Sequence, residues 1–223
     1  IASLALLLAA GTPALARTAA APIEIQTVRA GLHVLRGAGA NVVAWVGADG
    51  VVVVDSGLAA SAPQLLEALG RVSPGPLRFV VNTHWHPEHV GGNPALHQAG
   101  ARSLAHVDTR AGMAASHTIA GAPRGAMPML PFDAAVPLHL NGDRLDVLHV
   151  AGAQGSGDIV LWWEMANVVH VGDAQWPGGY PLVNAAGGGS LAGMVASIET
   201  VLSRADAATV IVPGHGPLSN RAE

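Results

Sequence analysis

A cluster of metal-ligand side chains begins where an apolar run of the chain ends. The run is Leu77–Val81, and the cluster is the segment Thr-His-Trp-His-Pro-Glu-His at positions 83–89. Side chains alternate along an extended segment, so His84 and His86 point to the same side. The chain then turns at the proline, which brings Glu88 and His89 toward the same space. Imidazole is the commonest metal ligand in proteins. Three imidazoles and a carboxylate at a strand end favour a site for one or two transition-metal ions over a surface patch of histidines.

Composition limits what kind of protein this is. The chain has 223 residues, of which 50% are apolar and 12% are charged, as expected for a globular chain with one sizeable core. A net charge of -4 and the absence of basic clusters argue against a nucleic-acid partner. There are no cysteines, so thiolate ligands and disulfides are excluded. All eleven basic residues are Arg, which also excludes a lysine nucleophile.

The beginning of the chain resembles an export signal. Residues 1–10 are almost wholly apolar, and small residues at Ala14 and Ala16 follow, as at the cleavage site of a secretory signal peptide. We therefore expect residues 1–16 to be a signal peptide remnant and the protein to be exported, either periplasmic or secreted. The apolar run is shorter than the roughly 20 residues that a membrane span needs. Residues 17–30 are predicted to be a linker.

The rest of the chain, residues 31–223, reads as one domain of the α/β (α+β) class. Predicted strands are 31–36, 40–46, 50–55, 77–82, 102–105, 135–140, 144–150, 158–163, 168–171 and 209–212. Predicted helices are 61–70, 89–98 and 191–202, the first with a capping box at Ser61 and Gln64 and a stop at Gly70. This order fits a four-layer αβ/βα sandwich, in which two sheets pack face to face with helices outside.

Potential ligands lie at or just beyond the ends of several predicted strands. Asp55, His84, Asp173 and His215 each occupy such a position. Their convergence at one edge of the scaffold would place an active site on the connecting loops.

Five segments in a fixed order make the chain resemble the metallo-β-lactamase superfamily. They are Val-Val-Asp-Ser-Gly at 53–57, the histidine cluster, residues 152–158, Val-Gly-Asp at 171–173 and Val-Pro-Gly-His-Gly at 212–216. The resemblance runs from about residue 31 to 218. Gly-Gly-Ser at 188–190 is similar to exported members of the superfamily.

The resemblance implies a set of metal ligands. They are His84, His86 and the position of Gln154 for a first metal, and Glu88, His89 and His215 for a second. Asp173 matches the carboxylate that bridges both metals in many family hydrolases. Asp55 matches a carboxylate that orients the ligands, although an acid at a strand end can also simply cap a turn.

Two of these positions depart from the family pattern. Glu88 stands where the family usually has Asp, and its extra methylene displaces the carboxylate by about an ångström, more than such a site tolerates. Gln154 stands where the first metal should have its third histidine. An amide oxygen is a neutral, weaker donor that suits harder ions better than zinc.

The chemistry that the resemblance implies is hydrolysis of a small-molecule substrate by metal-activated water. Glu88 and Asp173 would be the catalytic carboxylates, orienting the water and bridging the metals. The cofactor would be one or two Zn²⁺ ions, with Mn²⁺ or Fe²⁺ as alternatives. The bond could be a lactam, an ester or a thioester. Because two ligand positions are substituted, a non-catalytic binding protein that retains little or no metal is the alternative.

The remaining histidines and two aromatic residues receive structural interpretations. The histidines expected to be structural or exposed are His33, His97, His106, His117, His139, His149 and His170. Trp176 and Tyr180 either line a substrate entrance or serve packing.

Overall fold

Two mixed sheets form the centre of the computed structural model, which describes residues 22–116 and 125–223. The first sheet has seven strands in the order β1 to β7: Glu24–Arg29, Leu32–Arg36, Val42–Gly47, Gly50–Val54, Leu77–Val81, Arg102–His106 and Leu130–Phe132. The second has the order β13-β12-β11-β10-β9-β8. In chain order, β8 to β13 are Ala135–Leu140, Asp143–His149, Ile159–Trp163, Val168–His170, Val210–Val212 and Ser219–Asn220.

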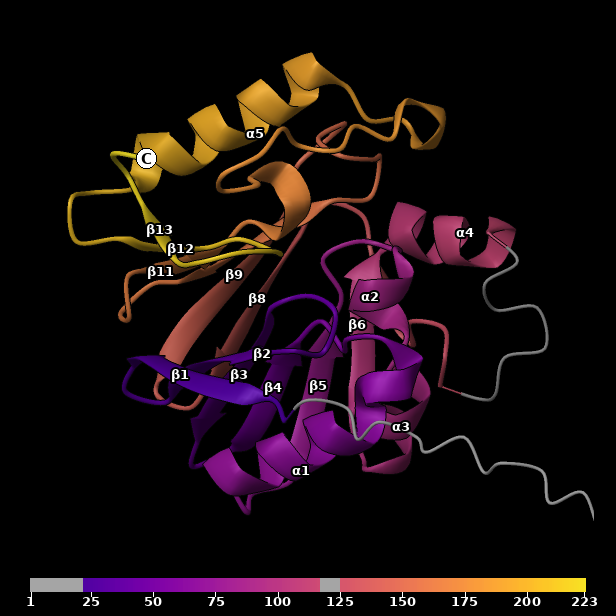
Figure 1. Cartoon of the computed structure of the whole chain (residues 1–223), viewed down its shortest axis with the longest axis vertical. Helices are drawn as coiled ribbons and strands as arrows, with labels where there is room; N and C mark the ends of the chain where they lie inside the picture. The colour runs from indigo at the N-terminus through magenta and orange to yellow at the C-terminus, as the bar shows by residue number, and fades with distance from the viewer. Residues whose placement is uncertain (1–21, 117–124) are drawn as a thin grey trace, which may run out of the picture.

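Helices cover the outer faces of the two sheets (Figure 1). The α-helices α1 to α5 are Ala62–Val72, Pro87–Val90, Asn93–Gln98, Val107–Ala115 and Leu191–Arg204. Short 3-10 turns η1, η2 and η3 are Ala59–Ser61, Gly172–Ala174 and Ala185–Gly187. In Figure 1, α1 and α3 lie below the first sheet and α5 lies above the second, which confirms the predicted four-layer sandwich.

The side chains of β4 show how the layers are held together. Val52 and Val54 point between the sheets and join the cluster that contains Trp163. Val51 and Val53 point to the other side and pack with Leu65 and its neighbours on α1. Because both faces of β4 are covered, the strand has no polar position before Asp55. The second sheet buries its outer face in the same way, against Met194 and Val201 of α5.

The predicted linker is wrong in part. Residues 24–29 form β1, which pairs antiparallel with β2 at the edge of the first sheet. Ile25 and Val28 pack against the two core clusters on either side of the sheet, and the strand satisfies backbone groups of β2 that would otherwise be unpaired. The predicted signal segment, residues 1–16, and the linker's first residues lie outside the described part of the chain.

Two predicted helices differ in detail. The first continues through Gly70 to Val72, and Ser61 makes no capping hydrogen bond because it closes η1 in a helical conformation. The predicted helix over 89–98 is two short helices, α2 and α3, separated by Gly91 and Gly92. A Cβ on Gly92 would lie 2.1 Å from the backbone oxygen of Ser56, so this break allows the chain to pass directly against the end of β4. Between the predicted strands 102–105 and 135–140 no element was predicted, and the structure has α4 and β7 there.

Parallel pairing in both sheets positions the strand ends. β4 runs parallel to β5 in the first sheet, and β11 runs parallel to β12 in the second.

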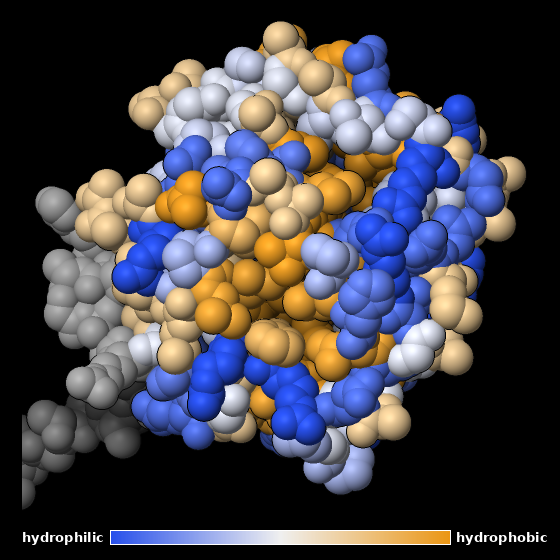
Figure 2. All heavy atoms as spheres, turned by 180° about the vertical axis from the view of Figure 1, so that it is seen from behind, coloured by the Kyte–Doolittle hydropathy of each residue, from blue (hydrophilic) through white to orange (hydrophobic). Residues whose placement is uncertain are grey.

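No described helix is both long and apolar enough to cross a membrane. On the face seen from behind, apolar surface gathers in a central hollow with polar residues along one side (Figure 2).

Candidate metal centre

The predicted ligands come together at one edge of the sandwich. Asp55 follows β4 and the histidine cluster follows β5, whereas Asp173 lies in η2 after β11 and His215 follows β12. The two halves are joined across the site, since Ile159 N donates to Thr83 O at 3.2 Å. Each sheet therefore supplies part of one cluster.

The ligand atoms form two groups. His84, His86 and Asp173 present ligand atoms within 4.8 Å of one another, and so do Glu88, His89 and His215. These are the residues that the sequence predicted, with Asp173 placed in the first group. Each group has the three protein ligands typical of a metal site that keeps an open position.

Asp173 lies at the centre of three imidazoles. Its carboxylate oxygens are 3.7 Å from His84 Nε2, 3.5 Å from His89 Nε2 and 3.6 Å from His215 Nε2. These distances are too long for hydrogen bonds. All three Nε2 atoms and Asp173 Oδ1 are buried and have no hydrogen-bond partner. Buried polar atoms are rarely left unpaired, and four that face one another fit divalent metal ions between them.

A hydrogen-bond network fixes which nitrogen of each histidine faces this space. Asp55 Oδ2 accepts from Thr83 Oγ1 at 2.8 Å and lies 2.7 Å from His89 Nδ1. With Asp55 ionised, His89 carries its proton on Nδ1 and presents the Nε2 lone pair to Asp173. Thr83 Oγ1 uses its hydrogen in the bond that it donates to Asp55, so it accepts from His84 Nδ1 at 3.0 Å and leaves His84 Nε2 without a proton as well.

Asp55 occupies a left-handed backbone conformation, with φ 61°. Asp and Asn tolerate this region better than most residues. The conformation turns the fully buried carboxylate toward Thr83, whose N–H also donates to Asp55 Oδ1 at 2.8 Å. Asp55 therefore caps the turn after β5 and also contacts His89, one of the predicted ligands. That it orients a metal ligand stays a prediction.

Burial sets the protonation of the cluster. Burial lowers the pKa of His84 and of His89 well below the ordinary value, so both imidazoles are neutral and have free lone pairs. Burial, and next the Asp55 carboxylate, raise the pKa of Asp173 to about 8. Burial likewise raises the pKa of Asp55 to about 7. A cation between these groups would offset the cost of burying the carboxylates.

Gln154 lies at the site and is 1% exposed. Its Nε2 donates to Asp173 Oδ2 at 3.2 Å, so the side chain holds the central carboxylate in place. The backbone N–H of Gly155 donates in turn to the buried Asp158, which anchors this loop. Ligation of a metal by the amide oxygen of Gln154 stays a prediction.

Two residues support the site through contacts that the sequence did not predict. Asn41 Nδ2 donates to the backbone oxygens of Pro213 and Gly216, both at 2.9 Å, and so clamps the loop that carries His215. A Cβ on Gly214 would lie 2.0 Å from Asp173 Oδ1, so only glycine allows this approach. An asparagine near the start of the apolar run at 40–46 was the available signal for Asn41.

The other histidines lie outside the two ligand groups. His170 is fully buried, and its Nδ1 accepts from Gly172 N at 3.0 Å. His106 and His149 stack with ring centroids 3.7 Å apart. His117 lies outside the described residues. Trp176 stacks on His215 at 4.5 Å and is 37% exposed, beside the site, whereas Tyr180 is fully exposed.

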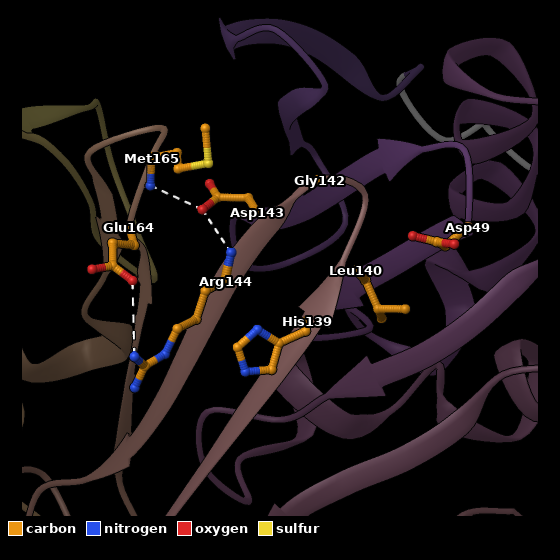
Figure 3. Close-up of a pocket in the computed structure, with 8 residues that line it drawn as sticks. All are labelled: Asp49, His139, Leu140, Gly142, Asp143, Arg144, Glu164 and Met165. Atoms are coloured by element: carbon orange, nitrogen blue, oxygen red, sulfur yellow. Dashed lines mark hydrogen bonds and ion pairs between the residues drawn. The ribbon is translucent and has the colours of Figure 1, made fainter.

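A separate cavity of about 450 Å³ contains none of these ligands (Figure 3). Asp49 lines it from the β3–β4 turn, and the other labelled residues come from the β8–β9 hairpin and the β10–β11 turn. The Asp143 carboxylate accepts from the backbone N–H groups of Arg144 and Met165, and Glu164 pairs with Arg144 at 4.0 Å. The polar groups of this cavity are therefore engaged in contacts that stabilise the turns around it.

Comparison with known proteins agrees with this geometry. A metallo-beta-lactamase from Pontibacter korlensis superposes with a TM-score of 0.75 at 20% identity, over 90% of this chain and 94% of that one. The DIM-1 metallo-beta-lactamase superposes with a TM-score of 0.73 at 17% identity, over 91% and 93%. At these identities the likeness shows the fold alone, and no curated protein matches the sequence. The sequence pattern of the family described as "Metallo-beta-lactamase superfamily" matches residues 36–215. The chain therefore belongs to the metallo-beta-lactamase superfamily.

Proposed function

We propose that this chain is a metal-dependent hydrolase that cleaves a lactam, ester or thioester bond of a small molecule. The observation that carries the proposal is the set of four buried, unpartnered atoms that face one another: His84 Nε2, His89 Nε2, His215 Nε2 and Asp173 Oδ1. One ion would be held by His84, His86 and Asp173, and another by Glu88, His89 and His215, with Asp173 between them. A divalent metal bound here would supply a water molecule whose pKa is lowered toward about 7.

The protein groups have distinct roles in this reaction. Glu88 is half-buried and belongs to the second ligand group, so its carboxylate would orient the attacking water and accept its proton. Asp55 and Thr83 would hold His89 and His84 with their Nε2 atoms turned inward. Gln154 would hold the Asp173 carboxylate through its amide N–H. The substrate would approach beside Trp176, which is exposed next to His215.

Zinc is the first metal to test, because imidazole and carboxylate ligands suit it. Because this chain has Gln154 where the family has a histidine, the first group keeps only two imidazoles and a carboxylate. This ligand set also suits Mn²⁺ or Fe²⁺. Among the bonds, a lactam is supported by the solved relatives, which are described as metallo-beta-lactamases. The signal-like segment at residues 1–16 supports export, so an extracytoplasmic substrate is part of the proposal.

A non-catalytic binding protein is the second candidate. It is favoured by one observation, that the amide N–H of Gln154 faces Asp173 where the family places a third imidazole. Such a protein would bind the small molecule without turning it over.

The experiment is a hydrolysis screen of the purified chain with zinc, manganese or no added metal. The substrates are a chromogenic β-lactam, p-nitrophenyl esters and an acyl thioester. We expect turnover of at least one class that depends on metal and is lost in His89→Ala. His97→Ala is the matched control, since His97 lies on α3 outside the ligand groups. Metal binding without turnover of any substrate would favour the binding protein.

A further inference from the structure

A cavity of about 500 Å³ lies beside the candidate metal centre, between α4 and the loop that contains η3. Its size falls within the range of roughly 300–1,000 Å³ that is typical of small-molecule sites. One wall is Trp85, and much of the remainder is made of small residues: Ala111, Gly112, Ala115, Ala186 and Gly187. The small side chains leave the space open, and the indole gives it an apolar wall.

The cavity adjoins the ligands on two sides. Trp85 lies between His84 and His86 in the sequence, and its ring centroid is 4.9 Å from that of His86. Ser156, on another wall, belongs to the loop that carries Gln154. A molecule with its reacting bond at the metal centre can therefore extend one end into this cavity.

Close backbone contacts fix the walls relative to one another. A Cβ on Gly112 would lie 2.6 Å from Trp85 Cδ1, so glycine lets the indole lie directly against α4. Thr109 Oγ1 on α4 donates to Gly157 O at 2.8 Å, and Ser156 N donates to Gly187 O at 2.8 Å. The helix, the loop of Gln154 and the η3 loop are thus tied together, which makes the cavity largely pre-formed.

The charge of the lining restricts what enters. Asp108 is the only charged residue among the described residues that line the cavity, and its side chain is 46% exposed. An anionic group would meet this carboxylate, and none of the described lining residues is a cation that could pair with it. An uncharged apolar group would bury surface against Trp85 and the alanines, which is favourable.

We propose that this cavity binds an uncharged hydrophobic group of the substrate, such as a medium-length alkyl chain. The assignment to a substrate rests on the proposed hydrolase function, whereas binding of the alkyl group does not. The protein would then act on compounds with a medium-length acyl group in preference to compounds with a short one.

Binding is tested first, with octanamide, butanamide and sodium octanoate titrated into the purified protein by calorimetry. Each methylene that enters the cavity should strengthen binding by up to about fourfold. Octanamide should therefore bind more tightly than butanamide, and more tightly than octanoate. Equal affinity for the two amides, or tighter binding of octanoate, would overturn the proposal.

Two filling variants locate the binding. Ala111→Phe and Ala186→Phe each fill the cavity from an exposed position on a different wall. Both should weaken octanamide binding about tenfold or more. The matched controls are Ala114→Phe and Ala185→Phe, on neighbouring exposed positions that do not line the cavity, and both should bind octanamide like the parent. Octanamide binding that survives both filling variants would place the ligand elsewhere and contradict the proposal.

Turnover separates this proposal from the proposed function. In the parent, kcat/KM should be higher for p-nitrophenyl octanoate than for p-nitrophenyl acetate. Ala111→Phe should lower the ratio of these two kcat/KM values about tenfold. Suppose that neither ester is hydrolysed but that the filling variants weaken octanamide binding and the controls do not. The cavity assignment then stands, and the proposal that the protein hydrolyses esters is contradicted. If both esters are hydrolysed at the same rate by the parent and by Ala111→Phe, the hydrolase stands and the cavity assignment fails.

Discussion

Asp55 Oδ2 lies 2.7 Å from His89 Nδ1, and both side chains are completely buried. The contact links a carboxylate at the end of β4 to an imidazole on α2. It turns His89 Nε2 toward Asp173 Oδ1, 3.5 Å away. Asp55 belongs to neither ligand group and acts through its contacts with Thr83 and His89, so it is a positioning residue. Its loss should lower the metal affinity.

Asp55→Asn should weaken metal binding about 10–100-fold. Asn tolerates the backbone conformation, but its amide cannot accept from Thr83 and His89 on both sides. Competition with a chromogenic chelator measures the affinity. Asp146→Asn is the control, since Asp146 pairs with Arg144 and Arg204 away from the ligands. Parent-like affinity in Asp55→Asn would show that Asp55 serves only the turn.

Gln154→His should raise the amount of metal bound and the rate of hydrolysis. The imidazole would replace a neutral amide that contacts Asp173, and so add a third imidazole to the first ligand group. Metal stoichiometry by mass spectrometry of the loaded protein checks this. Gln98→His, on the exposed end of α3, should bind no more metal than the parent. If Gln154→His also binds no more, residue 154 does not act as a ligand position.

Glu88→Gln should lower kcat about 10²–10⁴-fold, as expected when a positioned base is lost. Metal affinity should fall too, because a charged ligand becomes neutral. Glu88→Asp should retain or raise the activity, since it brings the residue to the usual family side chain. Glu67→Gln, on an exposed position of α1, serves as the control.

A helix-stabilising role for Glu88 predicts a different result. Glu88 lies in the first turn of α2, where a negative charge favours the helix dipole. In that case Glu88→Gln would cost up to about 1 kcal/mol of stability and leave kcat unchanged. Melting temperature and kcat measured on the same variants distinguish the two roles.

Asp158 should make the metal-free protein less stable as pH rises. Burial raises the pKa of Asp158 from its ordinary value of 3.8 to about 7 in the folded chain. The folded state then binds more protons than the unfolded state between these values, so the contribution is complete below 3.8 and is lost as pH rises through about 7. Relative to Asp158→Asn, the parent should lose at most about 1.4 kcal/mol per pH unit in this window. Urea denaturation at several pH values measures the difference, and parallel curves for the two proteins would contradict it.

The layers and the ligand positions were predictable because they depend on local patterns. The apolar residues of β4 required cover on both faces, and the spacing of His84, His86 and His89 indicated metal ligands before any fold was known. The edge strand β1 was missed because its six residues include four polar ones and its stability comes from pairing with β2.

Contacts between distant segments were not predictable in the same way. Asn41 reaches the His215 loop across 172 residues of sequence, and Gly214 meets Asp173 only after β11 and β12 pair. The orientation of the Gln154 amide depends equally on where Asp173 lies. Such contacts follow from the packing of the two sheets, which no local pattern specifies.

Metal content is the most direct test of the proposed centre. The purified chain is incubated with excess zinc or manganese, freed of unbound metal by gel filtration and measured by mass spectrometry. His89, Asp173 and His215 should retain at least one ion per chain, and the double variant His89→Ala, Asp173→Ala should retain far less. His97→Ala should retain as much metal as the parent. A parent chain that emerges metal-free after both incubations would contradict a metal centre at this site.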